Sequence, residues 1–402
     1  MPLAILLTAV TTATVILAGG SAALKSRSAT TSAPATATRA GAAGDLGGGV
    51  PPSQSKPFRF FALGDWGRRG VLNQTAVAGA MGARAAAAAA AGSPVSVIIS
   101  TGDNFYPYGL VSEEDPAFDA SFINVYTHPA LATIPWHSTL GNHDYAPVEG
   151  PRAAAALAGG KALAPLAEEC RGAGRGVCQY GPLPQLGARL PARDARWHAT
   201  RGKSYVPAGA PARAVGGVEF FFFDTSPSVK SYREEAWAAN PGGLNEQSPA
   251  GNLAELAAAL ASSPAKWRLV VAHHPPSGLR VPSRAPGLDA EVCPVAAAGG
   301  AAAFLSGHEH LLAYIATPAG PCAGVPQITS GSGGAVDSKP FTPNPGAAVA
   351  PGSVWWQGLE AGFVECAVSP STMACDWWGT VVGAKPLYSA VIKPPAGVGM
   401  DA

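Results

Sequence analysis

The pattern that decides the fold first occurs in FRFFALGDWG, residues 58–67. A short, mostly apolar run is followed at once by glycine, aspartate, tryptophan and a second glycine. Such a run bounded by glycine is typical of a buried strand. The glycine beside the aspartate permits a sharp turn and a close approach of the backbone. The stretch therefore predicts a buried strand with one carboxylate at its carboxyl end.

The same combination recurs four more times. The later clusters are Gly-Asp-Asn-Phe-Tyr at 102–106, Gly-Asn-His-Asp at 141–144, His-His-Pro at 273–275 and Gly-His-Glu-His at 307–310. Each follows a strand-like run, and ligand sites of α/β sheets form beyond the carboxyl ends of the strands. Asp, Asn, Tyr and His side chains bind hard or borderline metal ions through oxygen and nitrogen. The sequence therefore predicts one metal site assembled from five loops.

Strand-like runs alternate with helical segments between the clusters. Strands are predicted at 58–63, 95–101, 133–140, 218–224, 268–272, 302–306 and 325–330. Helices are predicted at 70–91 and 252–260, where Ala and Leu dominate. This alternation predicts an α/β layered sheet. Residues 362–368, 375–381 and 385–392 instead suggest three strands joined by short turns, an antiparallel edge that closes the domain.

The amino-terminal part of the chain does not fit this pattern. Residues 1–23 carry no charged side chain and end in small residues, which predicts a secretory signal peptide cleaved near Ala23. The alternative is an uncleaved anchor, which would place the protein at a membrane. Residues 24–56, rich in Ser, Thr, Ala and Pro, predict a disordered linker before a catalytic domain at 57–395. We therefore expect a secreted protein, or one in the lumen of the secretory or lysosomal/vacuolar pathway.

The amino-acid composition limits which partners the protein can bind and indicates the cellular compartment in which it folds. The formal net charge is +1, charged residues make up 13% of the chain, and no basic stripe alternates with aromatic residues, so nucleic-acid binding is not expected. The six cysteines fit an oxidising compartment, although buried thiols are the alternative. Their pairing is open; sequential pairing is the simplest, with Cys366–Cys375 favoured because these residues flank a hairpin turn. Asn73 begins a glycosylation sequon, which is consistent with secretion.

Residues 147–200 have no sustained periodicity. They are rich in Gly, Pro, Ala and Arg, and they contain Cys170 and Cys178. We interpret them as a surface insertion held by one disulfide near the mouth of the site. Functional loops and neutral insertions share this composition, and we favour a neutral insertion.

Taken together, the five clusters resemble those of the calcineurin-like metallophosphoesterases. More narrowly, they resemble the small, single-domain purple acid phosphatases of the tartrate-resistant type, because Tyr106 is typical of that branch. The similarity extends from about residue 58 to residue 392. The resemblance implies a layered β-sandwich, with two mixed sheets flanked by helices in the order α/β/β/α and closed by a carboxyl-terminal antiparallel hairpin. It also implies a monomeric enzyme that hydrolyses small phosphate monoesters at acidic pH.

The resemblance further implies a role for each matching residue. Asp103 would bridge two metal ions, and a metal-bridged hydroxide would attack the phosphorus atom. His143 would not bind a metal; it would face the phosphoryl group as a catalytic residue. Fe(III) would be held by Asp65, Tyr106 and His310. A divalent Fe, Zn or Mn ion would be held by Asn142, His273 and His308.

One departure from the family pattern concerns the acid that protonates the leaving group. Relatives carry a further histidine beyond the position of His273, and here the equivalent residue is Pro282. His274 is adjacent to His273, but on a strand its side chain is expected to point away from the metals. The leaving-group acid is therefore unassigned, and a structural role is expected for Glu309.

Two other functions stay open on the sequence alone. One is a phosphodiesterase or nucleotide hydrolase that uses Mn or Zn, and the other is a non-catalytic surface protein of the same fold. Outside the clusters, His137 and the tryptophan pairs Trp355-Trp356 and Trp377-Trp378 are expected to be structural.

Overall fold

The computed structural model describes residues 57–145, 181–202, 204–205, 217–239, 241–277, 285–338 and 351–395. The predicted signal peptide, the predicted linker, Cys170, Cys178 and Pro282 all lie outside these ranges. Within the ranges, no helix has both the length and the apolar character needed to cross a membrane.

The described residues form two seven-stranded sheets. In both sheets parallel pairs sit beside antiparallel ones, so both are mixed, as expected. The first sheet has the order β14 (Tyr388–Ile392), β13 (Met373–Gly379), β12 (Gly362–Val368), β1 (Phe58–Leu63), β2 (Val95–Ser100), β3 (Trp136–Ser138) and β4 (Trp197–Ala199). The second sheet has the order β11 (Val354–Gly358), β9 (Leu312–Ala316), β10 (Gln327–Ser330), β8 (Ala301–Ser306), β7 (Trp267–Val271), β6 (Val218–Phe222) and β5 (Ser204–Tyr205).

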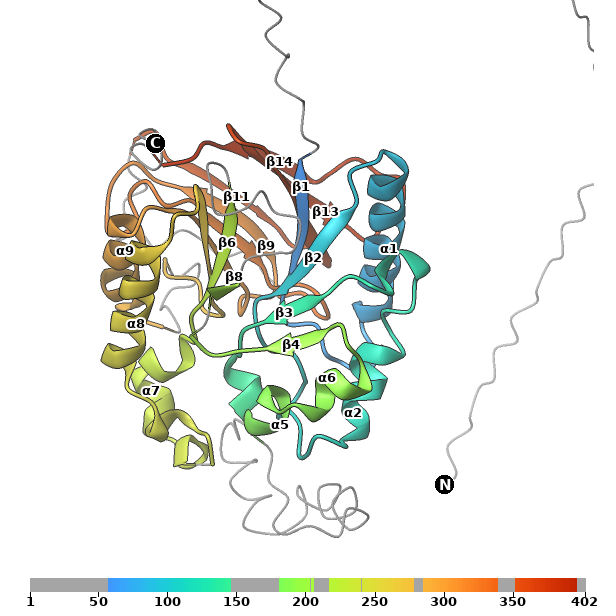
Figure 1. Cartoon of the computed structure of the whole chain (residues 1–402), viewed down its shortest axis with the longest axis horizontal. Coiled ribbons are helices and arrows are strands. Elements are labelled where there is room, and N and C mark those ends of the chain that lie inside the picture. Colours follow the sequence, from blue (N-terminus) through green and yellow to red (C-terminus); the bar gives the residue numbers. More distant parts are fainter. Residues whose placement is uncertain are drawn as a thin grey trace, which may run out of the picture. The chain divides into compact units, whose positions relative to one another are not determined.

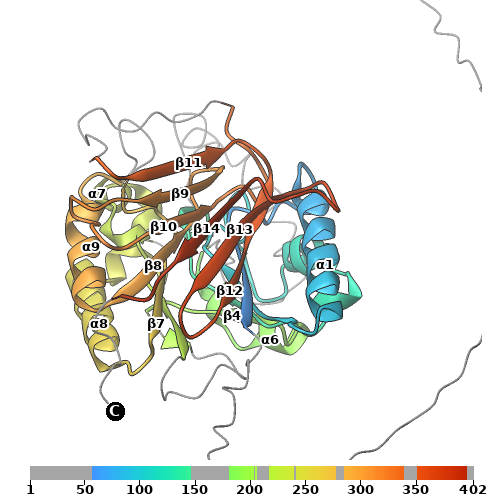
Figure 2. The same ribbon diagram turned by 90° about the horizontal axis from the view of Figure 1, so that it is seen from above.

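Helices cover the outer face of each sheet. Figure 1 shows α1 (Gln74–Ala90) on one side of the pair of sheets, and α8 (Pro249–Ser262) with α9 (Leu288–Ala298) on the other. Figure 2 shows the same arrangement from above. The shorter helices are α2 (Pro116–Phe118), η1 (Asp119–Ile123), η2 (Pro129–Leu131), η3 (Asn142–Tyr145), α5 (Leu183–Leu186), α6 (Arg189–Arg193), η4 (Ser226–Ser228), α7 (Lys230–Arg233), η5 (Ala236–Ala239) and η6 (Leu244–Glu246). The predicted α/β/β/α order is confirmed.

Strand alternation explains how the layers hold together. Along β1, Phe61 and Leu63 face the core beneath α1, whereas Phe60 and Ala62 face the core between the sheets. Successive side chains of a strand point to opposite faces, so a strand buried on both faces is apolar throughout. This is why FRFFAL contains almost no polar residue, and why the same is true of the runs that lead to the other clusters.

Several elements were not predicted. The strands β9 and β11 lie in the second sheet, at residues 312–316 and 354–358, for which the sequence pattern predicts no strand. Helix α9 was also missed, since it contains Pro294, a residue that disfavours a helix interior. The closing strands β12, β13 and β14 are confirmed as an antiparallel edge.

The described part of the predicted insertion is not a surface appendage. Strand β4 is the edge strand of the first sheet and pairs in parallel with β3. Leu190 and Trp197 are fully buried in the core beneath α1. The interpretation of residues 147–200 as a surface insertion is therefore wrong for residues 181–200, because their apolar side chains complete that core. Residues 146–180 lie outside the described ranges.

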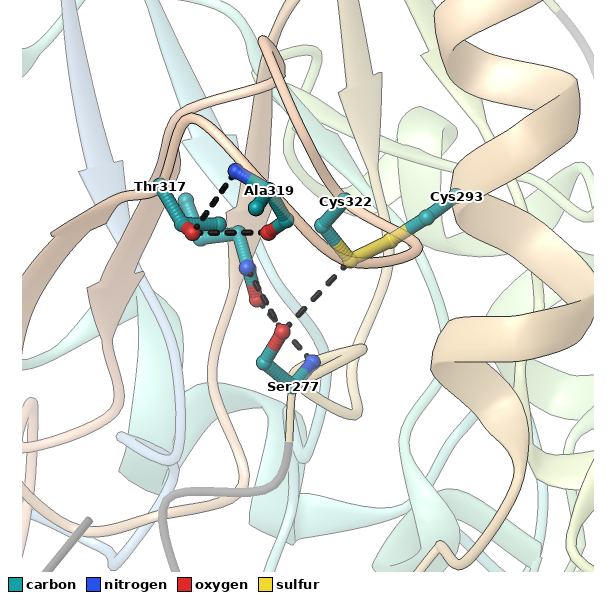
Figure 3. Close-up of a disulfide and its surroundings, with 6 residues drawn as sticks. Ser277, Cys293, Thr317, Ala319 and Cys322 are labelled. Atoms are coloured by element: carbon teal, nitrogen blue, oxygen red, sulfur yellow. Dashed lines mark hydrogen bonds between the residues drawn. A yellow bond between two sulfur atoms is a disulfide. The ribbon is translucent and has the colours of Figure 1, made fainter. Parts of the chain in front are cut away.

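Two disulfides follow the predicted sequential pairing. Cys366–Cys375 joins directly opposed residues of β12 and β13 in the first sheet. Cys293–Cys322 joins α9 to the turn between β9 and β10, in the second half of the fold. Figure 3 shows this bond with Ser277, whose hydroxyl oxygen lies 3.5 Å from the Cys322 sulfur. The disulfide thus lies beside the segment that follows His273.

Candidate metal centre

The five predicted loops meet at the carboxyl ends of strands from both sheets. Asp65 follows β1, Asp103 follows β2 and His308 follows β8, and all three have left-handed backbones, with φ of 60°, 52° and 66°. Neighbouring glycines permit this crowding. A Cβ atom on Gly141 would lie 2.2 Å from Asp103 Oδ1, and one on Gly307 would lie 2.5 Å from Asp65 Oδ2. The glycines of the clusters are therefore required where the loops approach one another.

One set of donors surrounds the phenol oxygen of Tyr106. We call Asp65, Tyr106 and His310 the tyrosine group. The phenol oxygen lies 3.0 Å from Asp65 Oδ1 and 3.1 Å from His310 Nε2. His310 Nε2 lies 3.4 Å from the same Asp65 oxygen. The three side chains therefore converge on one point.

A second set surrounds the imidazole of His273. We call Asn142, His273 and His308 the histidine group. His273 Nε2 lies 3.2 Å from Asn142 Oδ1 and 3.1 Å from His308 Nδ1. His273 Nδ1 lies 2.9 Å from the Thr101 carbonyl oxygen, which can only accept a hydrogen bond. This contact places the ring hydrogen on Nδ1 and leaves Nε2 available to bind an ion.

Asp103 lies between the two groups. Its Oδ2 atom accepts a hydrogen bond of 2.8 Å from the Tyr106 hydroxyl, and its Oδ1 atom lies 3.4 Å from His273 Nε2. Each oxygen of this carboxylate thus faces a different group. A carboxylate placed in this way has the geometry needed to bridge two ions.

The buried carboxylates of the site favour a positive charge beside them. Burial, together with the carboxylates of Asp103 and Asp65, raises the pKa of Tyr106 well above its usual range. Burial alone would raise the pKa of Asp103, but His273 and His143 outweigh it and hold that pKa well below the usual range. Burial alone would lower the pKa of His273, but Asp103 outweighs it and raises the pKa to about 9. Without a metal ion, protonated His273 balances the buried Asp103 carboxylate, and a bound metal ion would supply that positive charge in place of the proton.

The donor atoms present fit two different ions. The tyrosine group offers a carboxylate and a phenol, which suit a hard trivalent ion, and the histidine group offers imidazoles and an amide, which suit a divalent one. Asp65, Asp103 and His273 have ligand atoms within 4.8 Å of one another, as do His273, His274 and His308. The residues present therefore fit the dinuclear centre that the sequence led us to expect.

His143 lies at the accessible edge of the site. Its Nδ1 atom is 2.7 Å from the Pro107 carbonyl oxygen, so Nδ1 carries the hydrogen and donates it. Its Nε2 atom lies 4.0 Å from Asp103 Oδ2, and its side chain is 25% exposed whereas that of Asp103 is 2% exposed. The Nε2 atom is therefore the ring nitrogen of His143 that faces the donors.

The expectation that His274 points away from the site is wrong. Its ring is fully buried and lies 4.3 Å from the ring of His308, although its Nδ1 atom is held 2.9 Å from Thr225 Oγ1. The strand β7 ends at Val271, so the alternation of side chains expected for a strand does not extend to His274. Glu309, between two donor histidines, is only 2% exposed.

Three of the residues expected to be structural make packing contacts. His137 stacks on His198 at 4.8 Å between ring centres, and Trp377 is fully buried between the sheets. Trp356 stacks on Tyr388.

Sequence reasoning missed the residues that support the loops. Arg68 places its guanidinium carbon 3.6 Å from the ring centre of Tyr106. Asp144 is fully buried and accepts hydrogen bonds from the backbone N–H groups of Asn104 and Gly141. Asp144 belongs to the Gly-Asn-His-Asp cluster at 141–144, so the sequence pattern does indicate that it lies near the site. Gln185 is 1% exposed and donates a hydrogen bond to Asp144. It lies in none of the five clusters, so the sequence pattern does not indicate its role.

Known proteins are similar to this chain in sequence and in fold. A profile described as calcineurin-like phosphoesterase matches residues 58–312. Purple acid phosphatase 17 of Arabidopsis thaliana is 33% identical over 314 residues, which cover 75% of this chain and 77% of that protein. Tartrate-resistant acid phosphatase type 5 of Sus scrofa is 39% identical over 90 residues, or 22% of this chain and 26% of that protein.

A solved structure supports the fold. The purple acid phosphatase isolated from yellow lupin (Lupinus luteus) seeds matches with a TM-score of 0.53 at 15% identity, over 88% of this chain and 56% of that one. The family match, the relatives and the fold agree with the resemblance carried by the five clusters. The chain therefore belongs to the calcineurin-like phosphoesterase family, alongside the purple acid phosphatases, and is a phosphoric monoester hydrolase.

Proposed function

We propose that this protein is a secreted acid phosphatase that hydrolyses small phosphate monoesters at a dinuclear Fe(III)–M(II) centre, where M is Fe, Zn or Mn. The observation that carries the proposal is the position of Asp103, with one carboxylate oxygen facing the tyrosine group and the other facing the histidine group. The relatives named as purple acid phosphatases support the same activity.

Each ligand role rests on the donor geometry. Fe(III) would be bound by Asp65, Tyr106 and His310, with Asp103 shared between the ions. The divalent ion would be bound by Asn142, His273 and His308. When bound, the ions would polarise a phosphate ester and acidify water so that it can act as the nucleophile.

We propose that His143 transfers protons at the exposed side of the centre. Its Nδ1–H is fixed on the Pro107 carbonyl, so Nε2 alone can bond a phosphoryl oxygen or carry a proton. The Tyr106 ring, 4.4 Å away between ring centres, restricts the movement of the imidazole. His143 would therefore stabilise charge on the phosphoryl group, and it is the candidate to protonate the leaving group in place of the histidine replaced by Pro282.

The predicted leader and the two described disulfides support a proposal that the protein is secreted or enters the secretory or lysosomal/vacuolar lumen. We further propose that it acts as a monomer. Cleavage of the leader near Ala23 can be checked by determining the amino terminus of the secreted protein.

Metal analysis with an absorption spectrum tests the centre most directly. We expect two metal ions per chain, one of them iron, and a visible band from charge transfer between Tyr106 and Fe(III). Tyr106→Phe should abolish the band while keeping the ring. Tyr126→Phe, in a buried tyrosine that packs against Trp66 and Trp136, should leave the band unchanged.

Assays of a monoester and a diester across pH separate the remaining functions. Faster monoester hydrolysis at acidic pH supports the proposal. A preference for diesters, with Mn or Zn in place of iron, would identify the phosphodiesterase alternative. Absence of both metals and of turnover would refute the proposed centre.

A further inference from the structure

Gln185 connects two of the ligand loops from outside the five clusters. It lies in the short helix α5 and is 1% exposed. Its Nε2 atom donates a hydrogen bond of 2.9 Å to Asp144 Oδ1, and its Oε1 atom accepts one of 3.2 Å from Asn104 Nδ2. One buried amide therefore contacts a residue next to Asp103 and a residue two positions after Asn142.

Asp144 and Asn104 in turn fix the backbones that carry the donors. Asp144 accepts hydrogen bonds of 2.9 Å from Asn104 N–H and 2.8 Å from Gly141 N–H. The side-chain oxygen of Asn104 accepts hydrogen bonds of 2.6 Å from the hydroxyls of Ser100 and Ser138, at the ends of β2 and β3. The loops at 102–106 and 141–145 are thus joined by a buried polar network.

We infer that Gln185 is a positioning residue of the metal centre, which holds Asp144 and Asn104 so that Asp103 and Asn142 keep their places. A fully buried carboxylate needs donors for its lone pairs, and without Gln185 one of the donors to Asp144 is lost. The Asp144 side chain could then turn away from Asn104 and Gly141. Both loops, and the donors that they carry, would become less well defined.

The position of Gln185 is set by packing, not by the loops that it supports. Its backbone carbonyl accepts a hydrogen bond of 3.1 Å from the indole N–H of Trp197, which is fully buried on β4. The amide is therefore presented to Asp144 from a part of the fold that carries no metal donor. Residues 181–200, which the sequence suggested were a neutral insertion, would support the centre. This inference rests on the proposed function only in requiring that the centre bind metal.

Three variants test this role. Gln185→Leu removes both side-chain hydrogen bonds. Gln185→Glu keeps the acceptor for Asn104 but places a second carboxyl group beside Asp144. Gln327→Leu is the matched control, since Gln327 is also 1% exposed and makes two hydrogen bonds, with Ser277.

Zn²⁺ binding to the metal-free full chain is measured by calorimetry from acidic to neutral pH, together with thermal unfolding, kcat and KM. We expect Gln185→Leu to weaken Zn²⁺ binding by up to about 10-fold, the lower end of the range for direct partners of metal ligands, because Gln185 acts through Asp144 and Asn104. The loss should appear in kcat more than in KM, and Gln327→Leu should bind Zn²⁺ like the wild type. Gln185→Glu should weaken Zn²⁺ binding in the same direction, because it keeps the shape of the side chain but removes the donor to Asp144.

Wild-type Zn²⁺ affinity in Gln185→Leu, or equal losses in Gln185→Leu and Gln327→Leu, would overturn the inference. If Gln185→Leu does not fold, Gln185→Glu decides, because wild-type Zn²⁺ affinity in that variant would also overturn the positioning role. A wild-type protein that binds no Zn²⁺ would instead refute the proposed centre, and the role of Gln185 with it.

Discussion

The two sheets supply chemically different halves of the centre. Among the described residues, the strand ends of the first sheet carry oxygen donors, namely Asp65, Asp103, Tyr106 and Asn142. The strand ends of the second sheet carry nitrogen donors, namely His273, His308 and His310. The backbone N–H of His308 donates to Asp65 Oδ2 at 2.8 Å, so the halves are also joined directly. Both the tyrosine group and the histidine group contain donors from the two sheets, so a complete donor set depends on the packing of one sheet against the other.

The largest effect is expected at the residue that contacts both groups. Asp103→Ala removes the carboxylate that faces the tyrosine group and the histidine group, so both ions should bind poorly. Because bound metal ions contribute several kcal/mol to catalysis, kcat/KM should fall about 10³-fold or more. Metal content and phosphatase activity measure this. Asn142→Ala is the matched comparison and should chiefly lose the divalent ion. Retention of both ions in Asp103→Ala would show that the tyrosine group and the histidine group each bind an ion without Asp103.

A smaller effect is expected from the disulfides, one in each half. Cys293–Cys322 spans 29 residues and Cys366–Cys375 spans 9. Since the stabilisation grows with the length of the closed loop, removing the first bond by paired Cys→Ala changes should lower the free energy of unfolding by about 3–4 kcal/mol, and removing the second by about 2–3 kcal/mol. Urea unfolding measures both. A larger decrease on removing Cys366–Cys375 than on removing Cys293–Cys322 would contradict the loop-length argument.

The smallest effect concerns His137 and His198, on β3 and β4 of the first sheet. Burial, and then the neighbouring His198, lower the pKa of His137 to about 3. The unfolded chain takes up this proton near pH 6.5 and the folded protein does not, so the free energy of unfolding should decrease as the pH falls from 6.5 toward 3. The change is on the order of 1 kcal/mol because His137 is partly exposed to solvent.

His137→Phe should flatten this dependence when urea midpoints at pH 7 and pH 4.5 are compared. An unchanged slope would exclude the His137–His198 pair as the source. Such a result would leave the acid sensitivity of the fold to groups other than His273 and His310, because their raised pKa values stabilise the folded protein as the pH falls.

Much of the site could be predicted because its donors follow strands whose apolar runs are plain in the sequence. Asp65 and Asp103 come after strands predicted to within a residue, and neighbouring parallel strands bring their ends together. The role of Gln185 could not be predicted, since a glutamine in a short helix acquires its partners only from tertiary packing. Helix α9 was missed for a related reason, because packing against the second sheet overrides the local cost of Pro294.

The left-handed backbones of Asp65, Asp103 and His308 have a consequence for protein engineering. This conformation costs a residue with a side chain about 1–2 kcal/mol relative to glycine, which adopts it freely. A search for thermostable variants that scores folding alone would therefore favour glycine at these three positions and would remove three proposed metal ligands. Selection for stability and selection for phosphate hydrolysis thus act in opposite directions at these positions, and any stabilised form of this enzyme will have to gain its stability elsewhere.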